Sequence, residues 1–283
     1  MTNALIAARD AFALAHPEQR AVFDGRDWGF RDIGSGPCLL LIPGTLGRGD
    51  IFWQQIEALS DRLRIVAVSY PDRGGIADWA DDLFALLDRL GIAQASVLGS
   101  SLGGYLAQFM AGTWPERVER LIAANTLHSV AGLAGRMPYA LDLMAAPIDD
   151  LRAGFGNGLN VWRDTHPDQG DLVALLLQEA GGRILEGELR ARLNALKTAP
   201  ELPPVPLAPN RIFTVEADDD PLIPPDMRVA VRERLQPGTA YRFLHGGHFP
   251  YVVRPDHYTS MLATMMNLEQ TGPAWGEGKE RTA

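Results

Sequence analysis

Cysteine is nearly absent from this sequence of 283 residues, which contains only Cys38. A single cysteine excludes an intrachain disulfide and zinc motifs built on cysteine pairs. Because it opens the apolar run at residues 38–42, we interpret Cys38 as a small buried hydrophobe. The sequence also lacks an apolar run of about 18 residues, so it predicts no membrane span. Residues 1–20 lack the basic and apolar segments of a secretion signal, and we therefore expect a cytoplasmic protein.

Positive charge is also scarce, since 26 lysines and arginines stand against 35 acidic residues and leave a net charge of −9. An acidic surface repels phosphate backbones, which argues against a nucleic-acid partner. Hydrophobic residues make up 46% of the chain and charged residues 22%, a composition that favours a globular protein with a sizeable core. The length fits one large domain with an inserted subdomain, and we expect a monomer or a homodimer.

Strand-like and helix-like stretches alternate along much of the chain, a pattern typical of a parallel sheet covered by helices. Asp24-Gly25 lies between two strand-like pieces and predicts a hairpin. Asp50 is expected to cap the helix that follows it. Apolar runs predict buried strands at residues 39–42, 65–68, 96–98, 121–124 and 212–215, and a last strand at 241–244. The polar tail at residues 271–283 is predicted to be mobile.

The alternation stops at residues 127–209, where helical pieces are mixed with glycine and proline. We interpret this stretch as an inserted cap, which leaves residues 1–126 and 210–283 as the core. Its apolar side chains predict a hydrophobic pocket for a small-molecule substrate. Packing of the cap onto the core is the alternative, and it is the more common role for each such residue. The candidates for substrate binding are Met137, Tyr139, Met144, Phe155 and Trp162.

The strongest chemical signal is the sequence Gly99-Ser100-Ser101-Leu102-Gly103, which has the pattern G-x-S-x-G. It lies between an apolar strand and an amphipathic helix, the context in which a sharp turn presents a serine nucleophile. The helix N-terminus also favours developing negative charge. We therefore predict that Ser101 is a nucleophile; a tight glycine-rich turn is the structural alternative.

A serine nucleophile needs a base, and His248 is the best placed of the six histidines. It follows the last predicted strand and precedes the last helix, in the sequence His245-Gly246-Gly247-His248-Phe249-Pro250. A loop there reaches the sheet edge that carries Ser101. His245 is the alternative, unless it is a surface residue at the strand end.

The base in turn needs an orienting carboxylate, for which three adjacent aspartates are available. Two prolines fix the backbone of Asp220-Pro221-Leu222-Ile223-Pro224, so Asp220 is the favoured acid. Asp218 and Asp219 remain alternatives, with solvated loop positions or helix capping as their other interpretation. The chain order Ser, Asp, His is that of hydrolases with a G-x-S-x-G turn.

Two backbone N–H groups are predicted to form an oxyanion hole. One belongs to Leu102, directly after the nucleophile, and the other to Thr45 in the loop after the first buried strand. Gly44 permits a close approach of that loop. The alternative is that residues 43–47 form a simple turn. Chemistry of this kind requires neither a metal nor an organic cofactor.

These motifs resemble the α/β-hydrolase superfamily over essentially the whole chain. The resemblance rests on Pro43-Gly44-Thr45, residues 99–104, residues 220–224 and Gly247-His248-Phe249. It implies the α/β-hydrolase fold, a mostly parallel twisted sheet flanked by helices with an inserted helical cap. Many members carry His-Gly where this chain has Pro43-Gly44, a departure that keeps the backbone donor and changes its loop.

A narrower resemblance is to maspardin, an α/β-hydrolase-fold protein of animals. It is carried by residues 50–56, 70–71, 101–108 and 246–251. Maspardin has asparagine where the catalytic histidine would stand and is regarded as a non-enzymatic binding protein, whereas this chain has His248. The resemblance implies a relative with an intact triad.

We accordingly expect a serine hydrolase of the carboxylesterase type that acts on a small, hydrophobic substrate through an acyl-enzyme. A binding or scaffold protein on the same fold is the first alternative. The second is another reaction of the same triad, namely lactone opening, C–C bond hydrolysis, thioester hydrolysis or perhydrolysis. A serine nucleophile argues against dehalogenase chemistry, which uses aspartate in this fold.

Overall fold

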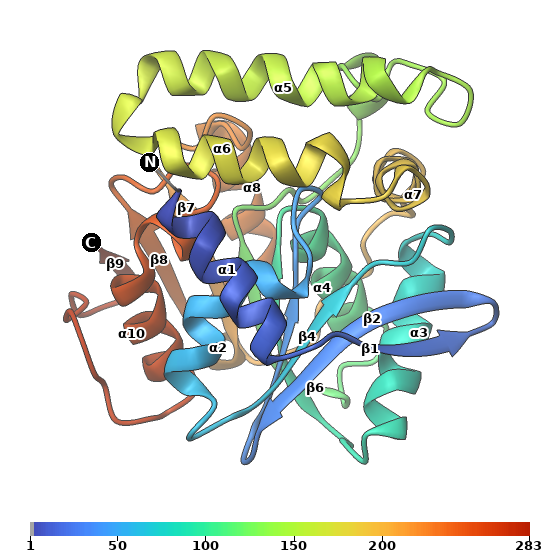
Figure 1. Ribbon diagram of the computed structural model, residues 1–283. Helices are drawn as coiled ribbons and strands as arrows, with labels where there is room; N and C mark the ends of the chain where they lie inside the picture. Colours follow the sequence, from blue (N-terminus) through green and yellow to red (C-terminus); the bar gives the residue numbers. More distant parts are fainter. Residues whose placement is uncertain (1–2) are drawn as a thin grey trace.

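The computed structural model describes residues 3–283, in which nine strands form one sheet (Figure 1). The order is β1-β2-β4-β3-β5-β6-β7-β8-β9. The two pairs that involve β2 are antiparallel, and every other neighbouring pair is parallel. The strands are β1 (Gln19–Phe23), β2 (Arg26–Gly34), β3 (Cys38–Ile42), β4 (Arg64–Ser69), β5 (Ala95–Ser100), β6 (Val118–Ala124), β7 (Ile212–Ala217), β8 (Thr239–Phe243) and β9 (Glu280–Thr282). The predicted parallel sheet and the hairpin at Asp24-Gly25 are confirmed.

Helices cover both faces of this sheet (Figure 1). Within residues 3–283 no helix is both long and apolar enough to cross a lipid bilayer. The helices are α1 (Ala4–Ala15), α2 (Trp53–Leu59), α3 (Ile76–Arg89), α4 (Leu102–Thr113), α5 (Ile148–Thr165), α6 (Gly170–Gln178), α7 (Glu186–Lys197), α8 (Pro225–Leu235), α9 (Pro250–Val253) and α10 (Pro255–Met265). A 3-10 helix (Gly49–Phe52) precedes α2, and a π-helix (Glu179–Arg183) separates α6 from α7.

Strand β3 shows how the sequence produces two cores, because all five of its residues are buried. Side chains alternate between the faces of a strand. Leu39 and Leu41 therefore pack into the core that includes α2 and α10, while Leu40 and Ile42 pack into the core that includes α3 and α4. Cys38 belongs to the second core, as predicted for a small buried hydrophobe.

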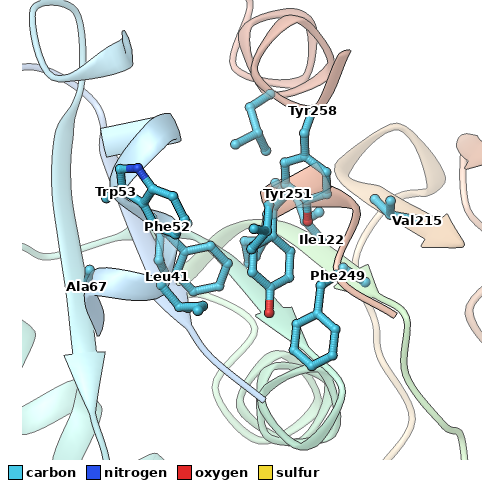
Figure 2. Packing of buried hydrophobic residues seen from close by; sticks show 14 of the residues in the cluster. Leu41, Phe52, Trp53, Ala67, Ile122, Val215, Phe249, Tyr251 and Tyr258 are labelled. Carbon is cyan, nitrogen blue, oxygen red and sulfur yellow. The ribbon is translucent and has the colours of Figure 1, made fainter. Parts of the chain in front are cut away.

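An aromatic cluster joins the segment after β3 to the segment after β8 (Figure 2). The rings of Phe52 and Tyr251 have centroids 4.7 Å apart, and Tyr251 and Tyr258 follow at 5.7 Å. Gln55 donates a hydrogen bond of 2.9 Å to the carbonyl oxygen of Tyr251. These contacts hold together two helical segments that lie far apart in the sequence, one after β3 and one after β8.

The C-terminal tail corrects one prediction. Residues 280–282 form β9, which pairs with β8, so the tail is part of the sheet and residues 241–244 are not its last strand. Trp275 explains this attachment, since its ring packs edge-on against Tyr241 and Phe243 with centroids 4.9 and 5.0 Å away. The prediction of a mobile tail overlooked the apolar area that one tryptophan can bury.

Asp50 corrects a second prediction. It lies inside the 3-10 helix, is buried, and makes no capping hydrogen bond. Its carboxylate instead contacts Arg183 at 2.5 Å and Arg31 at 3.2 Å. Arg183 also contacts Glu179, which meets the buried Arg9 of α1 at 2.5 Å. This chain of ion pairs ties the N-terminal helix and the π-helix to the loop after β3.

Candidate active site

Ser101 stands at the turn between β5 and α4 with φ 56° and ψ −118°, a conformation that is strained for a residue with a Cβ. The glycines on either side permit this turn. A Cβ on Gly99 would lie 1.9 Å from the carbonyl oxygen of Gly103, and a Cβ on Gly103 would lie 2.3 Å from that of Ile42. The backbone N–H of Ser101 donates to Ala124 O at 2.9 Å, which fixes the turn against β6.

His248 and Asp220 form a buried pair, with 6% and 8% of their surfaces exposed. His248 Nδ1 lies 3.0 and 2.8 Å from the two carboxylate oxygens of Asp220. A carboxylate accepts only from a protonated Nδ1, so neutral His248 keeps Nε2 free as an acceptor. Within residues 3–283 the structure contains no hydrogen bond between Ser101 Oγ and His248. In ligand-free enzymes such contacts are often longer than in the reacting complex.

The three adjacent aspartates have different partners. Asp218 forms a partly exposed ion pair with Arg242 at 2.6 Å. Asp219 accepts hydrogen bonds from the N–H groups of Gly246 and Gly247, at 3.0 and 2.8 Å. Asp220 is the one that meets the histidine. Asp219 is therefore neither a solvated loop acid nor a helix cap, because it holds the loop that carries His248.

Asn125 is a site residue that the sequence analysis missed. It follows β6 with φ 43° and is buried. Its Nδ2 donates to Asp220 Oδ2 at 3.0 Å and to Gly247 O at 3.4 Å, so it contacts both the acid and the histidine loop. Asparagine tolerates the left-handed backbone region better than most residues, but no motif marked this position.

Opposing effects act on the pKa of Asp220. Burial is the largest and raises the pKa. The charge of His248 and hydrogen bonds from His248, Asn125 and the Leu222 N–H act in the other direction. Together they outweigh burial and hold the pKa of Asp220 below its ordinary value. Asp220 thus remains a carboxylate at neutral pH, the form that can orient an imidazole.

The turn at residues 43–47 approaches the nucleophile closely. A Cβ on Gly44 would lie 3.0 Å from Ser101 Cβ and 3.7 Å from Ser101 Oγ. Gly47 N–H donates to Gly44 O at 3.1 Å and closes the turn. Among residues 3–283, the N–H groups of Thr45 and Leu102 have no hydrogen-bond acceptor. Both donors are thus free, one in the turn after β3 and the other at the first residue of α4.

The predicted substrate residues separate into two groups. Met137 and Met144 lie at the surface, 64% and 63% exposed, so the structure does not place them in an enclosed pocket. Tyr139 and Phe155 are partly buried against the core, and burial raises the pKa of Tyr139 to about 12. Trp162 of α5 lies over the histidine loop, since a Cβ on Gly247 would come within 3.2 Å of its ring. His245 is exposed at the end of β8.

The fold and the site together define an α/β protein with a serine on a sharp strand-to-helix turn and a buried His–Asp pair at the same sheet edge. Residues 37–255 match the family described as the alpha/beta hydrolase fold. This chain therefore belongs to the α/β-hydrolase family, and the predicted fold class is confirmed.

Similarity to individual proteins is more distant. The chain is 27% identical to the magnesium-chelatase 30 kDa subunit of Rhodobacter capsulatus, over 83% of this chain and 89% of that one. It is 24% identical to a pimeloyl-(acyl-carrier protein) methyl ester esterase of Nitrosomonas europaea, over 80% and 94%. Maspardin of Danio rerio is 33% identical, over 41% of this chain and 40% of its own length. The enol-lactonase structure from Burkholderia xenovorans LB400 superposes with a TM-score of 0.72 at 18% identity, over 88% of this chain and all of that one, and so shares the fold.

Proposed function

We propose that this protein is a serine hydrolase that cleaves an ester-type bond of a small, hydrophobic substrate through an acyl-enzyme. One observation carries the proposal: a strained Ser101 and a buried pair of His248 with Asp220 lie on loops at one edge of the sheet. Strain of this kind is costly and is concentrated at functional sites. The esterase name of one relative supports the same class of reaction.

In the proposed reaction, His248 Nε2 takes the proton of Ser101 Oγ as this oxygen attacks the ester carbonyl carbon. The carbonyl oxygen becomes an oxyanion, which accepts hydrogen bonds from the N–H groups of Thr45 and Leu102. Collapse of the intermediate expels the alcohol, and His248 gives it the proton. Water then attacks the acyl-enzyme with the same proton transfers and releases the acid and free Ser101.

Aromatic side chains support a hydrophobic substrate. Trp162 lies beside the histidine loop, and its Nε1 donates to Gln169 at 3.0 Å, which fixes the ring. We place Trp162, Phe155 and Tyr139 at the substrate side of the site, with Met137 and Met144 at the outer surface of the cap. No cofactor or metal takes part in the proposed steps, and the protein is proposed to act as a monomer or homodimer.

The test compares the wild type with Ser101→Ala on p-nitrophenyl acetate, butyrate and octanoate. Ser100→Ala is the matched control, because it removes the neighbouring hydroxyl from the same turn. We expect hydrolysis by the wild type and by S100A, and none above background by S101A. Equal background rates for all three proteins would reject esterase activity. That result would favour a binding protein, the role assigned to maspardin, or a lactone or C–C substrate.

A further inference from the structure

The turn at residues 43–47 is held mainly through its carbonyl oxygens. Tyr70 Oη donates to Pro43 O at 2.7 Å. Arg192 Nη1 donates to both Thr45 O and Gly47 O, at 2.9 and 2.8 Å. Arg192 belongs to α7, about 145 residues further along the chain and inside the predicted cap. One side chain from the cap thus binds two carbonyls of the loop beside Ser101.

The geometry of the peptide unit explains how hydrogen bonds to the carbonyl oxygens of the turn determine the direction of the Thr45 N–H. Each peptide unit is planar, and its C=O and N–H point in opposite directions. The hydrogen bond of Gly44 O with Gly47 N–H therefore turns the Thr45 N–H to the other side of the turn. Arg192 donates hydrogen bonds to two later carbonyl oxygens of the same turn, those of Thr45 and Gly47. Without it, rotation at these residues would change the direction of the Thr45 N–H.

The position of Arg192 is energetically demanding. The guanidinium is fully buried, and desolvation lowers the pKa of Arg192 to about 10, which still leaves it charged at neutral pH. Its acidic neighbour Glu188 is 3.4 Å away, a long contact for an ion pair. The ring of Tyr70 lies 5.1 Å from Cζ and adds a cation–π contact. Burial of a charge without a close counter-ion is expensive, which argues for a specific task.

A second contact from α7 reaches the end of the turn. Arg48, which follows Gly47, contacts Glu188 of α7 at 3.1 Å and Glu18 at 2.8 Å. Helix α7 is therefore attached to both the middle and the end of the turn. The arrangement couples the segment at residues 127–209 to the loop that supplies a donor for the oxyanion.

We propose that Arg192 is a positioning residue that holds the turn at residues 43–47 so that the Thr45 N–H points at the oxyanion formed on Ser101. The inference rests on the proposed function and adds a residue to it. Arg192 does not touch the reacting atoms; it acts through the carbonyl oxygens of Thr45 and Gly47.

A matched control exists on the same helix. Arg190 also donates to two backbone carbonyls, Leu143 O at 2.6 Å and Ala146 O at 2.8 Å, but both lie within the predicted cap. Comparison of Arg192→Met with Arg190→Met separates an effect on the turn from a general loss of cap packing. Arg192→Lys is the rescue variant, since an ammonium keeps charge and donors on a shorter side chain.

The experiment measures the rate at which a fluorophosphonate labels the full-length protein, together with kcat and KM for p-nitrophenyl butyrate. Labelling forms a P–O bond to Ser101 and expels fluoride, while the Ser101 proton passes to His248, and the phosphoryl oxygen occupies the oxyanion position. We expect R192M to be labelled about 10- to 100-fold more slowly than the wild type. Its kcat should fall, while its KM should change little. R190M should label at the wild-type rate, and R192K should fall between wild type and R192M.

Each other outcome overturns a defined claim. Wild-type labelling rates in both R192M and R192K would reject the role of Arg192 and leave the hydrolase proposal intact. Equal slowing in R190M, or slowing in proportion to the folded fraction seen by circular dichroism, would show that Arg192 only packs the cap. If R192M does not fold, the labelling rate of R192K provides the test: a rate below that of the wild type supports the positioning role, and a wild-type rate rejects it. A wild type that labels no faster than S101A would reject both the hydrolase and the positioning role.

Discussion

Replacement of Asp220 by asparagine should abolish most of the activity by changing the protonation of His248. Asp220 Oδ1 accepts from the N–H groups of Leu222 and Ile223 at 2.8 and 3.1 Å, so an asparagine oxygen would keep this place. The amide nitrogen would then face His248 Nδ1 and donate to it. His248 would carry its proton on Nε2 and could no longer accept one from Ser101.

The expected size of this effect follows from the loss of the base. An orienting acid changed to its amide costs about 10⁴ in kcat in a serine triad, or about 5.5 kcal/mol at about 1.36 kcal/mol per decade. The amide nitrogen would also meet Nδ2 of Asn125, now 3.0 Å from the carboxylate, and two donors would face each other. We therefore expect a loss of about 10⁴ with little change in KM.

The three adjacent aspartates supply the controls. Asp218→Asn alters only a partly exposed ion pair and should keep the wild-type kcat, because exposed ion pairs contribute little. Asp219→Asn keeps an acceptor oxygen for Gly247 N–H and should lose far less than D220N. Steady-state kinetics with p-nitrophenyl butyrate would measure all three variants. A wild-type kcat in D220N, or a larger loss in D219N, would refute the assignment of Asp220.

Three further predictions concern stability, each measured by urea or thermal unfolding. Gly99→Ala should destabilise the protein by about 3 kcal/mol, because a Cβ there would lie 1.9 Å from Gly103 O; an unchanged midpoint would contradict the strained turn. Asp50→Ala should cost about 2–3 kcal/mol at pH 7, since it removes the carboxylate that Arg31 and Arg183 share and leaves them only Glu18 and Glu179 as partners. Folding lowers the pKa of Asp50, so its contribution is present above the unfolded pKa and shrinks as the pH falls, and a pH-independent difference would count against it. Trp275→Ala should cost about 3 kcal/mol by freeing the tail, which a wild-type Tm would disprove.

Local patterns were sufficient for the framework of the fold. The run at residues 38–42 forms β3, and Ser101 lies between the end of β5 and the start of α4 as predicted. These features depend on neighbours in the sequence, namely continuous apolar residues and glycines next to a serine. The same local character allowed Asp220 and His248 to be placed on loops after β7 and β8, where they form hydrogen bonds.

Contacts between distant residues that belong to no recognised motif could not be predicted. Asn125 and Asp220 are separated by 95 positions, and neither position indicates that one amide joins the acid to the histidine loop. The sequence does not distinguish Asp219 from the two aspartates beside it. Only the structure shows that it accepts hydrogen bonds from Gly246 and Gly247. The prediction of a mobile tail was wrong because it relied on the polar composition of residues 271–283 and gave no weight to Trp275, which is buried. In each case the deciding information is the identity of a partner from another part of the chain.

The segment at residues 127–209 contains two parts that relate differently to the site. Helix α7 buries most of its residues and binds the turn beside Ser101 through Arg192, so it cannot move without disturbing that turn. Helix α5 lies outermost across α6 (Figure 1) and buries only Leu151 among its described residues. Sequence changes in α5 can therefore alter the surroundings of Trp162 and the histidine loop while the turn keeps its geometry. Under the proposed function, such changes would alter substrate preference and leave the chemistry at Ser101 unchanged.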